Sequence, residues 1–203
     1  MRSFEELQEE IIILNKNGVN FLMAASMCWL LIALIWLLPY SAAEKAYFTF
    51  YACAPMMPLA YLFSKLFRTK WKIAQNPLNT LGLRLNLAQL FYFPFVFILM
   101  GKNPVEMPMA LAIITGAHFF PYAWFYRSKS FAVMAGIIVL SCTLIGTSSR
   151  IPNPPLYIAL LMAVSLWVLA LWSFADYRKV KHAHLRQSTM APETPAVSAA
   201  FSL

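Results

Sequence analysis

Six polar side chains between residues 84 and 122 have the types and spacing that could do chemistry, because the sequence around them is almost wholly apolar. They are Arg84, Asn86, Gln89, Thr115, His118 and Tyr122. Histidine is the side chain whose charge changes closest to neutral pH. The amides of Asn86 and Gln89 could hold one tautomer of His118 by hydrogen bonding. The set therefore predicts a polar pocket or a proton-linked path.

The spacing of these residues predicts that they meet. Asn86 and Gln89 are three residues apart, which places them on one face of a helix. Thr115, His118 and Tyr122 share a face of the next apolar stretch in the same way. Two helices joined by a short loop pack antiparallel, and each group lies about 9–14 Å from the same end of the pair. We expect a cluster of Asn86 and Gln89 with His118.

Two prolines follow the polar groups closely. Pro94 is expected to free the carbonyl of Leu90, and Pro121 that of Ala117, because proline lacks the N–H that would bind it. Freed carbonyls at membrane depth are tolerated where they meet protein partners or line a wet cavity. The prolines therefore fit a pocket without requiring one.

The alternative interpretation is that the cluster only holds helices together. Hydrogen bonds between membrane helices average about 0.6 kcal/mol each, and the apolar stretches provide His118 with no acidic partner. Against this, ionisable residues inside a membrane are functional suspects. Arg84 is expected to extend to the inner surface, or alternatively to bind an anionic group at the pocket mouth. Both interpretations stay open here.

Several other chemistries find no support. Apart from Glu106 at the first position of one block, the apolar stretches contain no Asp or Glu, which argues against paired-carboxylate catalysis, and the sequence has no phosphate-binding loop or zinc-protease motif. Cys28, Cys53 and Cys142 fall in apolar stretches without metal-ligand spacing, so each is expected to be a buried hydrophobe. The sequence favours a non-enzymatic protein without cofactor or metal.

The elements that must position the cluster are long apolar blocks. The 203-residue chain is 61% hydrophobic and only 12% charged, whereas a soluble domain is about 25% charged. A helix of about 20 apolar residues crosses a bilayer. Six blocks reach that length and predict an all-α, six-transmembrane-helix bundle: residues 18–40, 46–64, 81–101, 106–126, 130–148 and 155–175.

The distribution of basic residues predicts the orientation. With six spans and a cytoplasmic N-terminus, only Lys45, Lys102 and Arg150 of the 16 Lys and Arg residues fall outside the cytoplasmic face, a strong positive-inside bias. Both termini are therefore expected in the cytoplasm, in a cell inner membrane. The basic residues flank spans, so anionic lipid head groups are the expected partners rather than nucleic acid. A second copy or another membrane protein is a further candidate partner.

The ends and irregularities of the chain have their own signals. Residues 1–17 are predicted to form an amphipathic interfacial helix with a Ser3–Glu6 capping box. Residues 18–177 are predicted to form the membrane domain. Residues 178–203 are predicted to form a basic tail that is disordered from residue 187. Pro55 and Pro58 predict a kink in the second span. Ala112 with Gly116, and Ala132 with Gly136, predict close helix packing.

The hairpin also resembles a known family. The runs Asn76-Pro77-Leu78, Asn86 to Leu90, Tyr92-Phe93-Pro94 and Ile114 to Tyr122 are similar to those of an uncharacterised family of small bacterial multi-pass membrane proteins. The resemblance implies fold and location, and no activity. The leading functional hypothesis is a small permease or carrier with the polar pocket. The alternative is a membrane scaffold or sensor subunit acting through the N-terminal helix and basic loops.

Overall fold

The computed structural model describes residues 2–71, 73 and 75–190. These residues form helices and no strand, which confirms the all-α class. In chain order the elements are α1 (Phe4–Asn15), the 3-10 helix η1 (Lys16–Gly18), α2 (Val19–Ile35), α3 (Ala42–Tyr51), α4 (Met56–Phe67), α5 (Pro77–Ala88), the 3-10 helix η2 (Gln89–Tyr92), α6 (Phe93–Lys102), α7 (Met107–His118), α8 (Phe120–Phe125), α9 (Lys129–Gly146) and α10 (Pro154–Met190).

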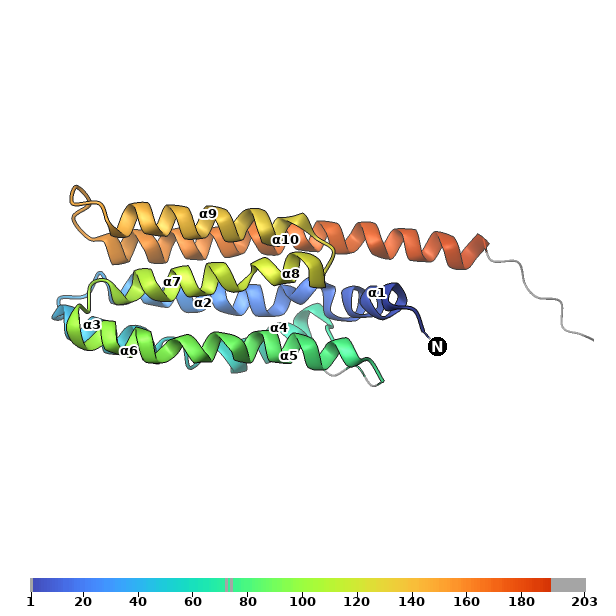
Figure 1. Ribbon diagram of the computed structural model, residues 1–203, viewed down its shortest axis with the longest axis horizontal. Coiled ribbons are helices and arrows are strands. Elements are labelled where there is room, and N and C mark those ends of the chain that lie inside the picture. Colours follow the sequence, from blue (N-terminus) through green and yellow to red (C-terminus); the bar gives the residue numbers. More distant parts are fainter. Residues whose placement is uncertain (1, 72, 74, 191–203) are drawn as a thin grey trace, which may run out of the picture.

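The helices form an elongated bundle with their axes close to its long direction (Figure 1). Helix α2 packs against α10 and α4, and α9 packs against α10, α7 and α8. Many of the most deeply buried side chains, among them Ile32, Ile138, Met162 and Leu166, come from these central helices. The N-terminus and the end of α10 lie at the same end of the bundle, which we call the N-terminal end.

Several helices are long and apolar enough to cross a membrane. Among the described residues four qualify alone, within Phe4–Ile35, Pro77–Lys102, Lys129–Gly146 and Pro154–Arg186, and the bent pair α3 and α4 adds a fifth if it is counted as one span. That pair bends by 42° at residues 52–55, which confirms the kink predicted from Pro55 and Pro58. The expected block 106–126 is interrupted at Phe119, where α7 gives way to α8, and is not one continuous helix.

The N-terminal helix begins as its sequence predicts. The Ser3 Oγ accepts a hydrogen bond from the Glu6 N–H at 3.2 Å, and a Glu6 carboxylate oxygen accepts one from the Ser3 N–H at 3.2 Å, so the capping box is confirmed. The helix ends at residues 16–18, which all have left-handed backbone conformations. A side chain at Gly18 would also place its Cβ 3.1 Å from the Tyr126 hydroxyl.

Ser3→Ala should loosen α1 without disturbing the rest of the bundle. Loss of an N-cap hydroxyl costs about 1 kcal/mol, and we expect the loss as faster amide hydrogen exchange confined to residues 4–8. Ser3→Asn, which keeps a capping side chain, is the control. Equal exchange in the alanine and asparagine variants would show that the cap does not stabilise α1.

The last helix is longer than predicted. The span was expected to end near residue 175 and disorder to begin at 187, but α10 runs for 37 residues to Met190. At 1.5 Å per residue this is about 55 Å, well beyond the thickness of a bilayer core. No proline or glycine interrupts residues 156–190, and Lys and Arg are good helix formers. The predicted disorder of residues 191–203 lies outside the described residues.

Candidate functional site

The polar cluster forms between the two helices that the sequence pairs. Asn86 lies near the end of α5 and Gln89 begins η2, while Thr115 and His118 lie on the last turns of α7. The His118 Nε2 is 3.4 Å from the Asn86 Oδ1. The Gln89 side-chain N–H donates to the Thr115 hydroxyl at 3.2 Å. The structure thus brings His118 to Asn86, as expected, but it pairs Gln89 with Thr115 and not with His118.

Tyr122 joins the cluster from α8. Its hydroxyl donates to the carbonyl of Gly82 at 3.3 Å, and the same carbonyl accepts the Asn86 side-chain N–H at 3.1 Å. The ring of Tyr122 meets the His118 ring edge to face at 5.2 Å. Gly82 allows this approach because a Cβ there would lie 3.0 Å from the Phe125 ring. Arg84 is exposed and takes no part in these contacts.

The cluster is at the surface of the bundle. Tyr122 is buried, Gln89, Thr115 and His118 are half-buried, and Asn86 is exposed. Of the carbonyls expected to be freed by proline, that of Leu90 accepts the Phe93 N–H and that of Ala117 accepts the Phe119 N–H. The described contacts are therefore those of an interface between helices whose backbone groups are paired within the protein.

Thr115→Val tests the cluster as a structural interface. The hydroxyl of Thr115 donates to the Leu111 carbonyl within α7 and accepts from Gln89 across the interface. We expect a loss of about 0.6 kcal/mol in the free energy of unfolding, the average for one contact between membrane helices. Reversible unfolding in mixed micelles measures it.

Thr143→Val is the matched control, because the Thr143 hydroxyl donates only to Val139 in its own helix. It should change the free energy of unfolding less than Thr115→Val does. A Thr115→Val variant as stable as the control would mean that the Gln89 contact holds nothing together.

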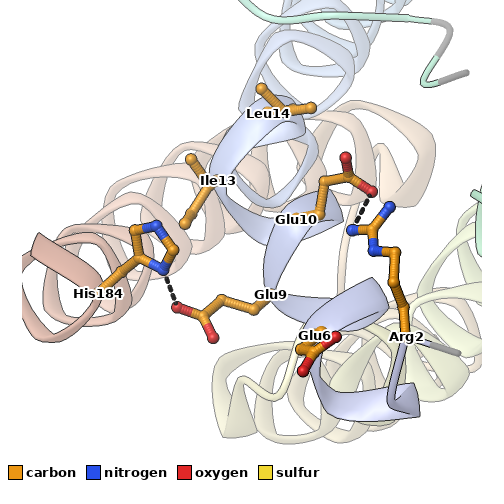
Figure 2. Close-up of a pocket in the computed structure, with 7 residues that line it drawn as sticks. All are labelled: Arg2, Glu6, Glu9, Glu10, Ile13, Leu14 and His184. Atoms are coloured by element: carbon orange, nitrogen blue, oxygen red, sulfur yellow. Dashed lines mark hydrogen bonds and ion pairs between the residues drawn. The ribbon is translucent and has the colours of Figure 1, made fainter. Parts of the chain in front are cut away.

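The two hollows described for the surface both lie at the N-terminal end, away from this cluster. The first, of about 420 Å³, lies beside α1, and Figure 2 shows its lining side chains. They are Arg2, Glu6, Glu9, Glu10, Ile13, Leu14 and His184. The second lies along one face of α10 and is lined by Ala175, Arg178, Lys179, His182, Ala183 and Arg186.

At the first hollow, glutamates of α1 bind side chains from other segments of the same polypeptide. The His184 Nδ1 lies 2.8 Å from a Glu9 carboxylate oxygen, which joins α10 to α1, and Arg2 pairs with Glu10 at 2.8 Å (Figure 2). Glu10 also accepts the Asn76 side-chain N–H at 2.8 Å. The acidic face of α1 therefore binds groups within the chain.

Helix α1 is tied to the rest of the bundle by residues that the sequence analysis did not select. The buried Gln8 donates to the carbonyl of Trp124 at 2.6 Å, and Asn76 donates to the carbonyl of Leu7 at 2.8 Å. The Leu14 carbonyl accepts the Lys70 N–H at 3.0 Å. The one local signal was Asn76 before Pro77, the pattern of an N-cap with proline at the first helical position.

In the part of the chain that the structure describes, these features define an all-helical protein with four to five apolar helices of membrane-crossing length and a polar cluster between neighbouring helices. The chain belongs to DUF7010, a family of unknown function whose profile matches residues 4–176. The predicted resemblance to an uncharacterised family is confirmed. No curated protein and no solved structure matches the chain. The family match takes in α1 and the whole polar cluster.

Proposed function

We propose that the protein is a six-pass protein of a bacterial inner membrane, with both termini in the cytoplasm, and that it is a scaffold or sensor subunit without catalysis. The observation that carries this is the exposure of the third span. Only 6% of the most apolar 18-residue window in Pro77–Lys102 is buried, against 61% in Phe4–Ile35. A helix so little covered by its own chain is available to a partner helix.

The exposed surface of this span is large and apolar. Leu83, Leu87 and Phe91 are 59%, 46% and 85% exposed. Lipid covers such side chains well, but it offers the exposed amide of Asn86 no hydrogen bond beyond those that the amide makes with Gly82 and His118. Polar groups facing lipid at this depth are costly, whereas a polar side chain on a neighbouring helix would pair with the amide. The combination favours a transmembrane helix of a partner protein.

The contacts of α1 at the N-terminal end of the bundle fit the proposed role as a sensor. Helix α1 is bonded to the loop before α5, to the end of α8 and to α10. A displacement of α5 by a partner would act on α1 through Asn76, which caps α5 and binds Leu7. That connection is the physical basis for a sensor, because it joins the exposed span to the cytoplasmic helix.

Photo-crosslinking in native membranes tests the proposal. A photoreactive amino acid at Leu87 or Phe91 should give discrete protein adducts. The same amino acid at Leu144 or Leu171, which are 71% and 67% exposed on α9 and α10, should give lipid adducts only. Adding Asn86→Leu should reduce the protein adducts at Leu87. Lipid adducts alone at all four positions would contradict the proposal.

A carrier is the second candidate, and one observation favours it. The third span changes to 3-10 geometry at Gln89–Tyr92, and the opposing helix breaks at Phe119, so both interruptions flank the polar cluster. Carriers bind substrates at discontinuous helices. In a variant without native cysteines, Thr115→Cys should then react with a membrane-impermeant thiol reagent. Leu111→Cys, one turn along and buried, is the control.

A further inference from the structure

Three cationic side chains from distant parts of the sequence lie together at the N-terminal end of the bundle. They are Lys16 in η1, Arg68 at the end of α4 and Lys181 in α10. The Lys16 ammonium donates to the Phe67 carbonyl at 2.5 Å, which places it beside Arg68. The ammonium also lies 5.9 Å from the centre of the Tyr177 ring. Tyr177 precedes Lys181 by about one turn of α10.

The Lys16 ammonium is repelled by the two other cations, and the ion pairs of the described residues give it no counter-ion. Lys181 and Arg68 both act on the Lys16 ammonium as like charges. The ion pairs found among the described residues use Arg2 with Glu10, Lys179 with Asp176 and His184 with Glu9, and so leave these three cations aside. Because like charges at close range destabilise one another, an anion bound among them would relieve the repulsion.

The position of the cations indicates which anion. Helix α2 begins three residues after Lys16, and α4 ends at the residue before Arg68. Tyr177 is buried at the level where the apolar part of α10 gives way to Arg178 and Lys179. Aromatic and basic side chains at such points mark the interface between hydrocarbon and water. The phosphates of phospholipids lie at that level.

The side chains have the chemistry to hold a phosphate. Arg68 and Lys181 are exposed and Lys16 is half-buried. A bound phosphate would therefore lie at the surface of the protein, with the more buried Lys16 ammonium beneath it. The Lys16 ammonium has three N–H donors, of which one binds Phe67. The Arg68 guanidinium offers paired N–H donors that match phosphate oxygens.

We propose that Lys16, Arg68 and Lys181 form a binding site for the phosphate of an anionic phospholipid in the cytoplasmic leaflet. The inference requires the membrane orientation stated above and does not depend on the scaffold or the carrier function. The charge of Lys16 is the central element, because its ammonium binds the Phe67 carbonyl beside Arg68 and lies near the Tyr177 ring, one helical turn before Lys181.

Native mass spectrometry of the full chain in detergent, titrated with phosphatidylglycerol or phosphatidylcholine, tests the site. The wild type should bind phosphatidylglycerol at least tenfold more tightly than phosphatidylcholine. Each charge near an anionic lipid contributes about fivefold. The triple variant Lys16→Gln, Arg68→Gln, Lys181→Gln should therefore lose about 100-fold in affinity for phosphatidylglycerol.

The matched control removes three other charges of α10, those lining the second hollow, with Arg178→Gln, Lys179→Gln and Arg186→Gln. It should lose less than fivefold in affinity. An equal loss in both triple variants would overturn the site, because it would show diffuse attraction to the basic surface. Lys16→Arg should bind as the wild type does, which separates loss of charge from loss of folding.

A competition arm separates a lipid from a free anion. Inorganic phosphate at millimolar concentration should leave phosphatidylglycerol binding unchanged, since the acyl chains contribute to the affinity for the lipid. Displacement of the lipid by inorganic phosphate, or phosphate binding without lipid binding, would overturn the assignment to a phospholipid.

Discussion

Gly116→Ala is expected to lower the free energy of unfolding by about 1–3 kcal/mol, the usual cost of overpacking. A Cβ at this position of α7 would lie 2.5 Å from the Ile138 Cγ2 and 3.3 Å from the Val139 Cγ2 on α9. Ile138 is fully buried, and a β-branched side chain in a helix has one preferred rotamer. The contact can be relieved only by moving the two helices apart.

Gly136→Ala is the matched control, because a Cβ there meets nothing within 4 Å. Alanine is favoured over glycine in a helix by about 1 kcal/mol, so this variant should be as stable as the wild type or more so. Reversible unfolding in mixed detergent micelles compares the two. A Gly116→Ala variant as stable as Gly136→Ala would show that α7 and α9 are farther apart than the structure places them.

Asn76→Ala is expected to release α1 from the bundle, at a cost of about 2–3 kcal/mol. The Asn76 Oδ1 accepts the Leu78 N–H at 3.0 Å and so caps α5, and loss of a cap costs about 1 kcal/mol. Its side-chain N–H groups donate to Leu7 and to the Glu10 carboxylate, both at 2.8 Å. Hydrogen bonds to charged groups contribute about 1.5–3 kcal/mol. Hydrogen exchange in residues 4–15 should accelerate with the loss of stability.

Two further variants divide this effect into its parts. Asn76→Asp keeps the cap of α5 but replaces the donors with a carboxylate that Glu10 repels, so it should release α1 and leave α5 protected. Asn79→Ala, three residues along the same helix, should leave exchange in α1 unchanged. If Asn76→Ala and Asn79→Ala gave the same exchange in α1, the contacts of Asn76 would not hold this helix.

The features that the sequence determined by itself depend on residues close together in the chain. The all-α class follows from apolar blocks of bilayer length, and the bend near Pro55 follows from the missing proline N–H. The Ser3–Glu6 capping box is a matter of three-residue spacing. The meeting of Asn86 with His118 was predictable for the same reason, because a short turn joins their helices and forces them to pack antiparallel.

Only the tertiary structure showed the contacts between distant segments. Gln8 binds Trp124, Asn76 binds Leu7, and Lys16 lies between Phe67 and Tyr177. No periodicity relates the members of these pairs, so nothing in the sequence selects them. The sequence also did not show the exposure of Pro77–Lys102, because the apolar residues of this segment do not reveal how much of their surface the rest of the chain covers.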